Sequence, residues 1–256
     1  MRFVVLGSGT SFGVPQIGCD CRVCTSSDPR DRRTRVAALV EADDGTRLLI
    51  DTPPELRLQL LAAGIDAVDA VLYTHDHADH VHGIDDLRAV SLKKGRVPLY
   101  GELGTLERIV RRFGYIFENG ATVPGIFKPD LTTVAVQPGR QVSVCGIPIL
   151  PLQLFHGSTS VLGYRIGSLA YMTDVKTVPD ETLDLVKGVE VLILSALLDR
   201  PHPTHLSIDE AVVLAQEIGA VRTYMTHLTH LHTHVELSER LPDGIEPAHD
   251  GLEFEL

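Results

Sequence analysis

The chain has 256 residues, of which 44% are hydrophobic and 22% charged, and this is ordinary composition for a folded globular protein. Its formal net charge of −11 argues against nucleic acid as a partner, because the surface as a whole does not attract polyanions. The first residues, MRFVVLGSG, form too short an apolar run for a secretory signal, and no stretch of the sequence has the apolar length of a membrane span. We therefore expect a cytoplasmic protein with no membrane partner.

Short apolar runs along the chain predict buried strands, and longer periodic segments predict helices. One helix, at residues 208–218, begins with Ser207 and Glu210 in the positions of a capping box. Residues 117–129 contain proline, glycine and aromatic side chains without a period, so we expect an irregular loop near the functional site. The predicted strands are 3–6, 36–41, 47–50, 70–73, 97–100, 131–136, 147–154, 162–166, 169–172, 189–194 and 221–225, and the other predicted helices are 55–63, 83–93, 105–113 and 180–186.

The order of these elements predicts the fold class. Strands come first, and two stretches of mixed strands and helices follow. This order favours one α/β domain over residues 1–256, with two packed mixed sheets and helices on the outer faces. Candidate ligands follow predicted strands at Asp51, His75, His156, Asp174 and His227, and strand ends that meet at one edge are a natural place for a site.

The densest group of candidate ligands follows the predicted strand at 70–73, in the sequence His-Asp-His-Ala-Asp-His. It places His75, His77, Asp79 and His80 within six residues. Imidazole and carboxylate together suit zinc, manganese or iron, and a pair of such ions needs about six or seven ligands. Buried without a partner, each of these polar groups would cost about 1–3 kcal/mol. The cluster therefore predicts a metal site.

This segment resembles the H-x-H-x-D-H signature of the metallo-β-lactamase superfamily, and the resemblance extends over nearly the whole chain. It implies the αββα sandwich of that superfamily and three later ligands, each after a strand. The matching positions are His156 in L-F-H-G, Asp174 in Y-M-T-D and His227 in Y-M-T-H.

The resemblance also implies how the ligands are shared between two divalent ions, zinc or manganese. His75, His77 and His156 would hold one ion, and Asp174 would bridge both. Asp51 matches an acidic residue behind the site, which would accept a ring N–H from a ligand histidine. The second ion would be held by Asp79, which we also count as catalytic, together with His80 and His227.

Three of the four cysteines lie within six residues, at Cys19, Cys21 and Cys24. In a cytosolic chain this C-x-C-x2-C spacing favours a structural zinc over disulfides. A tetrahedral zinc needs a fourth ligand. We choose His230, which lies three residues beyond His227, while His232, His234 and His249 stay open as alternatives.

The same cysteines, together with G-x-G-T-S-x-G-V-P at the start and T-H-L-T-H near the end, resemble the cyclic phosphodiesterases of phosphonate breakdown, the PhnP family. The resemblance implies a structural zinc held by the cysteines and His230. It also implies a catalytic histidine before a late helix, which matches His205. This residue would protonate the departing oxygen or donate a hydrogen bond to the phosphoryl oxygen.

These features favour a metal-dependent phosphodiesterase that acts on small or cyclic phosphodiesters through a hydroxide shared by two metals. A tRNase Z-like endonuclease and a PqqB-like non-catalytic or biosynthetic protein remain alternatives. The stretch after Asp51, D-T-P-P-E-L-R, is closer to PqqB and differs from the PhnP pattern, so the substrate does not carry over. The oligomeric state is open, a homodimer included.

Two further groups are expected to have no role in catalysis. Arg30, Arg32, Arg33 and Arg35 form a basic cluster that we interpret as a solvated loop and not as a nucleic-acid site. Cys145 lies in an apolar strand pattern, which predicts a small core residue.

Overall fold

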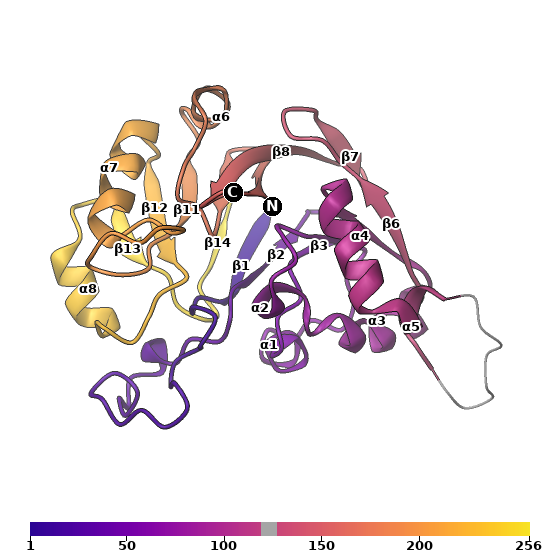
Figure 1. Ribbon diagram of the computed structural model, residues 1–256, viewed down its shortest axis with the longest axis horizontal. Helices are drawn as coiled ribbons and strands as arrows, with labels where there is room; N and C mark the ends of the chain where they lie inside the picture. Colours follow the sequence, from indigo (N-terminus) through magenta and orange to yellow (C-terminus); the bar gives the residue numbers. More distant parts are fainter. Residues whose placement is uncertain (119–126) are drawn as a thin grey trace.

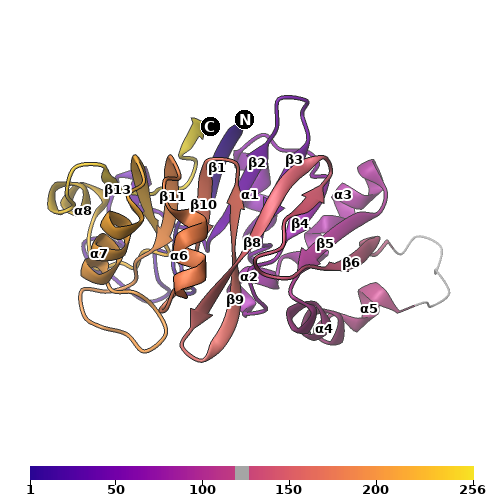
Figure 2. The same cartoon turned by 90° about the horizontal axis from the view of Figure 1, so that it is seen from above.

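The computed structural model describes residues 1–118 and 127–256 (Figure 1). The loop predicted at residues 117–129 falls mostly on residues 119–126, which lie outside the described residues. The described residues form two sheets of seven strands each, packed face to face with helices on the outside (Figure 2). The predicted fold class is thereby confirmed.

The first sheet contains the N-terminal half of the chain and one strand from its end. Its order is β14-β1-β2-β3-β4-β5-β6. Pairing is antiparallel from β14 to β3 and parallel from β3 to β6. The strands are β1 (Arg2–Gly7), β2 (Ala37–Glu41), β3 (Arg47–Ile50), β4 (Ala70–Leu72), β5 (Val97–Gly101), β6 (Leu131–Ala135) and β14 (Glu253–Glu255).

The second sheet contains the C-terminal half and repeats this mixture of pairings. Its order is β13-β12-β11-β10-β9-β8-β7. Pairing is parallel from β13 to β10 and antiparallel from β10 to β7. The strands are β7 (Val142–Val144), β8 (Ile147–His156), β9 (Thr159–Ile166), β10 (Leu169–Met172), β11 (Val191–Ser195), β12 (Arg222–Thr226) and β13 (Ile245–Pro247).

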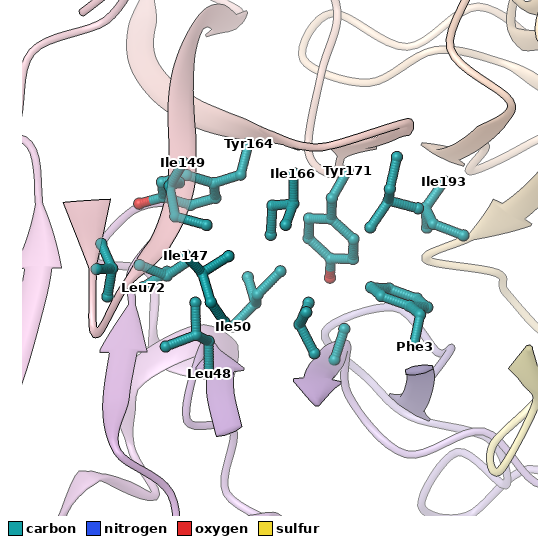
Figure 3. Packing of buried hydrophobic residues seen from close by; sticks show 14 of the residues in the cluster. Phe3, Leu48, Ile50, Leu72, Ile147, Ile149, Tyr164, Ile166, Tyr171 and Ile193 are labelled. Carbon is teal, nitrogen blue, oxygen red and sulfur yellow. The ribbon is translucent and has the colours of Figure 1, made fainter. Parts of the chain in front are cut away.

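The main core lies between the two sheets, where Figure 3 shows Leu48 and Ile50 of β3 opposite Ile147 and Ile149 of β8. Leu49, between the first two, points to the other face and packs against the outer helices. The strand is apolar on both faces because both are buried, which explains its continuous hydrophobic run. Full burial of each such side chain contributes about 1.5–3 kcal/mol.

Helices cover the outer face of each sheet. On the first sheet, Leu56 and Leu106 are among the helix residues of the outer core, and on the second sheet Ile208 and Ala211 take that place. Capping boxes at Ser207 and Thr233 begin two of the helices. The first group is α1 (Leu56–Ala62), α2 (Ala78–Val81), α3 (Leu87–Lys94), α4 (Leu103–Arg112) and α5 (Gly114–Phe117), and the second is α6 (Asp180–Val186), α7 (Ile208–Ile218) and α8 (His234–Arg240).

The elements predicted from apolar runs all occur, with ends shifted by a few residues. Those missed are short or polar: β7, β13, β14, α2, α5 and α8. The short strand β14 pairs with β1 through its backbone, and the alternating Leu252, Phe254 and Leu256 in and beside it pack against the main core, a brief pattern that the prediction overlooked. In the part of the chain that the structure describes, no helix has the length and apolarity needed to cross a bilayer.

Candidate metal centre

The predicted ligands lie where strands of both sheets end. Asp51 follows β3, His156 is the last residue of β8, and Asp174 and His227 follow β10 and β12. Asp51, Asp174 and His227 have positive φ angles of 63°, 53° and 59°. Residues other than glycine rarely adopt this left-handed conformation, and they do so most often at functional sites. The backbone thus turns sharply at these three strand ends to direct the side chains inward.

The His-Asp-His-Ala-Asp-His segment forms the turn from β4 into α2. His75 is buried, His77 is the residue before α2, and Asp79 and His80 lie within that short helix. The His75 ring centroid is 4.5 Å from that of His77 and 4.1 Å from that of His80. The segment therefore gathers its own imidazoles, as the spacing predicted.

His156 joins this group from the second sheet. Its ring centroid lies 5.2 Å from that of His77 and 5.8 Å from that of His75. Its Nδ1 lies 2.8 Å from the carbonyl oxygen of Thr204. A carbonyl only accepts, so Nδ1 carries the proton and Nε2 is left as a lone-pair donor for a metal.

Asp174 occupies the middle of the cluster. Its Oδ2 is 3.2 Å from His80 Nε2, and its Oδ1 is 3.3 Å from His227 Nε2. Burial alone would raise the pKa of Asp174, but the neighbouring rings of His227 and His80 hold this pKa well below its ordinary value. The carboxylate is therefore charged and faces ligand atoms on both sides.

Asp51 lies behind the cluster and is completely buried. Its Oδ2 accepts from His80 Nδ1 at 2.7 Å, and its oxygens accept from the backbone N–H and the hydroxyl of Thr74 at 2.9 and 2.8 Å. Burial alone would lower the pKa of His80, but Asp174, Asp51 and Asp79 together raise this pKa well above its ordinary value. The contact from Asp51 fixes the His80 tautomer and directs Nε2 toward Asp174, which confirms the predicted place of Asp51 behind the site.

The buried nitrogens test whether the cluster suits a metal. His75 Nε2, His80 Nε2 and His227 Nε2 are buried and have no hydrogen-bond partner among the described residues. Buried polar atoms almost always find a partner, so several unpartnered nitrogens gathered around one carboxylate fit a bound cation. Oxygen and imidazole ligands of this kind suit a divalent metal. Among the described residues, ligand atoms lie within 4.8 Å of one another in three overlapping groups: His75, His80 and Asp174; Asp79, His80 and His227; and His156, Asp174 and His205. His77 is in none of these three groups, and its ring lies beside those of His75 and His156. We call the residues His75, His77, Asp79, His80, His156, Asp174 and His227 the histidine centre.

His205 lies against the histidine centre, two residues before the cap of α7. Its ring stacks on His227 at 4.8 Å and meets His156 edge-on at 4.4 Å, and its Nδ1 is 3.8 Å from Asp174 Oδ1. Burial and the adjacent His227 lower the pKa of His205 to about 3. The ring is therefore neutral at pH 7 and carries one N–H donor and one lone pair.

The three clustered cysteines meet His230, as predicted. The distances from His230 Nδ1 to the Sγ atoms of Cys19, Cys21 and Cys24 are 3.3, 3.5 and 3.4 Å. Around a tetrahedral zinc with ordinary bond lengths, sulfur and nitrogen ligands would lie about 3.6 Å apart. These four residues, which we call the cysteine site, have the arrangement that such an ion requires.

The other three histidines considered for the fourth ligand have different neighbours. His232 Nε2 is 2.9 Å from Asp199, and His234 and His249 meet edge-on with centroids 5.5 Å apart. Within the cysteine site, the backbone N–H of Cys24 lowers the pKa of Cys21 to about 6, whereas burial raises the pKa of Cys24 to about 11. A low thiol pKa favours the thiolate that binds metal.

Two interpretations from the sequence are wrong. Arg30 and Arg32 are exposed as a solvated loop predicts, but Arg33 in the same loop is 1% exposed, and its guanidinium donates to backbone carbonyls near His230. Cys145 is not a core residue: it is exposed, at a φ of 50° in the turn between β7 and β8. Burial of an arginine needs specific acceptors, which a basic run in the sequence does not reveal.

Sequence reasoning also missed residues that hold the site together. Asp250 accepts from both the backbone N–H and the hydroxyl of Ser8, each at 2.8 Å, and also from Thr34. Ser8 in turn accepts from the backbone N–H of Leu228, next to His227. The G-S-G-T segment, residues 7–10, is therefore extended chain that continues from β1, and a β-bridge from Gly9 to Leu228 places it beside His227. Its partner Asp250 lies near the end of the chain, which the sequence pattern does not reveal.

Comparison with known proteins agrees with this geometry. The family model of the β-lactamase superfamily domain matches residues 46–228, which contain every residue of the histidine centre. The crystal structure of a diphosphatase from the PhnP family covers 100% of this chain and 97% of its own, with 42% identity and a TM-score of 0.91. The zinc-bound PqqB of Methylobacterium extorquens shares the fold, with 20% identity, full coverage of both chains and a TM-score of 0.78.

A curated relative, an octanoyltransferase of Porphyromonas gingivalis, is 41% identical over 255 residues. The match covers 99% of this chain but only 51% of that relative, so the chain spans about half of its length. The name of that relative therefore describes a protein about twice as long. The superfamily model matches more than half of this chain, and the PhnP-family structure covers all of it, so the chain belongs to the β-lactamase superfamily and, within it, to the PhnP family.

Proposed function

We propose that this hydrolase is a metal-dependent phosphodiesterase that acts on small or cyclic phosphodiesters. One divalent ion, zinc or manganese, would be held by His75, His77 and His156. Asp174, between the two sets of imidazoles, would be shared by both ions. A separate structural zinc would be held by Cys19, Cys21, Cys24 and His230, and the second catalytic ion by Asp79, His80 and His227.

The central position of Asp174 is the observation that carries this proposal. One of its oxygens faces His80 and the other faces His227, while the same carboxylate also groups with His75 and with His156. A carboxylate between two sets of imidazoles is the arrangement that a bridging ligand requires. When bound there, a pair of divalent cations supplies a hydroxide nucleophile at neutral pH and neutralises charge on the phosphoryl oxygens.

The protein's own residues orient the reaction. His205 lies at the edge of the centre and is neutral, because burial and His227 lower its pKa to about 3. A neutral imidazole donates one hydrogen bond, so His205 acts as an N–H donor to a phosphoryl oxygen or to the departing oxygen. Asp51 holds His80 in place through its 2.7 Å contact, and the Thr204 carbonyl does the same for His156.

Hydrolysis of a diphosphate is a second candidate, because the similar PhnP-family structure is named a diphosphatase. A phosphodiester and a diphosphate both present phosphorus with charged non-bridging oxygens and an oxygen leaving group. The two substrates differ in the group that leaves. An alkoxide is a strong base and needs a proton from a donor such as His205, whereas a phosphate is a weaker base and depends less on such a donor. The site geometry suits both.

A substrate panel tests the proposal. Purified protein loaded with manganese or zinc would be assayed with bis(p-nitrophenyl) phosphate, a nucleoside 2′,3′-cyclic phosphate, a dinucleoside diphosphate and a precursor tRNA. We expect turnover of the first two. Preference for the diphosphate would select the second candidate, and cleavage of the tRNA well above the small diesters would select the tRNase Z-like alternative. Turnover of none, with an empty histidine centre, would select the PqqB-like alternative.

A further inference from the structure

Arg33 lies outside the two metal-ligand groups and is almost completely buried, with 1% of its surface exposed. One terminal nitrogen of its guanidinium donates to the carbonyl of Thr229, and the other donates to the carbonyl of His232 at 3.0 Å. The second nitrogen also lies 3.4 Å from Asp31 Oδ1. The planar fork of arginine can bind two carbonyls at once, which the ammonium of a lysine cannot reproduce.

Asp31 completes this contact from the same loop and is 2% exposed. Its Oδ1 accepts the backbone N–H of His234 at 2.6 Å. Arg33 and Asp31 therefore hold the backbone of residues 229 and 232, between β12 and α8, and of residue 234, where α8 begins. We call this pair of residues the Arg33–Asp31 clamp.

The held segment carries one ligand from each proposed metal site. His227, two residues before Thr229, belongs to the histidine centre, and His230, one residue after it, belongs to the cysteine site. Leu228, between these two histidines, pairs with the segment after β1. Its backbone N–H donates to the carbonyl of Ser8, and its carbonyl accepts from the backbone N–H of Thr10. A shift of this segment would move both histidines.

The backbone of Arg33 also fixes the loop that carries the cysteines. Its N–H and carbonyl pair with the carbonyl and N–H of Val14, each at 2.8 Å. Val14 packs with Val23 and Cys24 in the small apolar cluster of that loop. One residue thus contacts both the cysteine loop and the histidine segment.

Stability alone explains this arrangement poorly. Burying an ion pair costs several kcal/mol per charge, and apolar replacements are often as stable or more so. The best-supported role of a buried ion pair is to select one conformation over alternatives. Here the geometry fixed is the separation and direction of His227 and His230.

We propose that the Arg33–Asp31 clamp is a positioning device that sets His227 and His230 together, so that metal binding at the histidine centre and at the cysteine site depends on the same pair of residues. This inference rests on the two metal sites of the proposed function. It assigns no contact with substrate to Arg33 or Asp31.

The test measures metal affinity at each site separately in the full chain. Wild type, Arg33→Lys, Arg33→Met and Asp31→Asn would be loaded with cobalt(II). The thiolate-to-cobalt charge-transfer absorption reports the cysteine site, the total bound cobalt minus the occupancy of that site reports the histidine centre, and EDTA competes for both. Arg30→Met is the matched control, because Arg30 lies in the same loop but is exposed and pairs with Asp28. Thermal unfolding of the metal-free proteins checks folding.

We expect Arg33→Lys and Asp31→Asn to weaken cobalt binding at both sites by about 10–100-fold, as loss of a residue that orients metal ligands does. Arg30→Met should bind as wild type does. Unchanged affinities in the folded Lys and Asn variants would overturn the clamp, and so would a loss confined to the cysteine site. If Arg33→Met does not fold, the other two variants decide. If wild type binds cobalt at both sites but hydrolyses no phosphodiester, the proposed function is contradicted and the clamp is not. The clamp is tested by cobalt affinity and not by turnover.

Discussion

The histidine centre and the cysteine site are built in opposite ways. The ligands of the histidine centre come from the ends of strands in both sheets, and three of the residues in and behind it adopt left-handed backbone conformations. The cysteine site takes three ligands from one short loop with a small apolar cluster of its own, and only His230 comes from elsewhere. The two sheets therefore position the residues of the histidine centre, whereas the order of the cysteine loop depends on the contacts within the cysteine site itself.

This difference predicts different consequences of losing each site. Removing a ligand from the histidine centre leaves the strands and the main core intact, so activity is lost while the fold stays. Removing a ligand from the cysteine site frees a loop with few other constraints, so local order and stability are lost first.

The largest effect is expected at His205. His205→Ala removes the N–H donor beside Asp174 and should lower kcat/KM for bis(p-nitrophenyl) phosphate by about 10²–10⁴-fold. Its metal content, measured by plasma mass spectrometry, should equal that of wild type. His202→Ala is the control, since its ring lies 5.3 Å from that of His205 but farther from the centre. Loss of a metal ion in His205→Ala would make His205 a ligand, in keeping with its grouping with His156 and Asp174.

A smaller effect on activity is expected at the cysteine site. Cys21→Ser should remove one metal per chain and lower the melting temperature by about 5–10 °C, because zinc binding is coupled to the folding of its loop. The value of kcat should stay within about threefold of wild type, because the Arg33–Asp31 clamp still holds His227. Cys145→Ser, at an exposed turn, is the control. A collapse of kcat in Cys21→Ser would mean that the two sites are not separate.

The smallest effect concerns pH. Burial and the nearby Arg30, His249 and Arg33 lower the pKa of His234 to about 4, against about 6.5 in an unfolded chain. Between pH 4 and pH 6.5, unfolding is therefore accompanied by proton uptake at His234. The free energy of unfolding should fall as the pH drops from 6.5 toward 4. The measurement is denaturant titration of metal-loaded protein at several pH values. Over this pH range the free energy of unfolding of His234→Phe should fall by about 1–2 kcal/mol less than that of wild type. An equal pH dependence in His234→Phe and in the exposed control His82→Phe would contradict this assignment.

The sequence predicted the two sites unequally well. Ligands that are adjacent in the chain, such as His75 to His80 and the three cysteines, were evident from spacing alone. His156, Asp174 and His227 were candidates from their places after predicted strands, but joining them to the same site required the family resemblance, because their convergence depends on strand order. Three alternatives to His230 could be separated only by the tertiary structure. The buried role of Arg33 was missed because its acceptors are backbone carbonyls far along the chain.

The fold followed from sequence for a similar reason. Strands buried on both faces, such as β3, are continuous apolar runs and were predicted close to their observed ends. β14 and α8 were missed because both are short, although Thr233 and Glu236 form a capping box and Leu252, Phe254 and Leu256 alternate with glutamates. A pattern of so few residues is weak evidence for an element by itself.

The most direct test of the two-site account is the metal content of wild type and of His77→Ala, measured by plasma mass spectrometry together with turnover of bis(p-nitrophenyl) phosphate. Because His77 contributes only to the histidine centre, we expect about three metals per chain in wild type and fewer in the variant, with activity lost in parallel. A single zinc that the variant leaves unchanged, with no turnover in either protein, would contradict the account and favour a PqqB-like role.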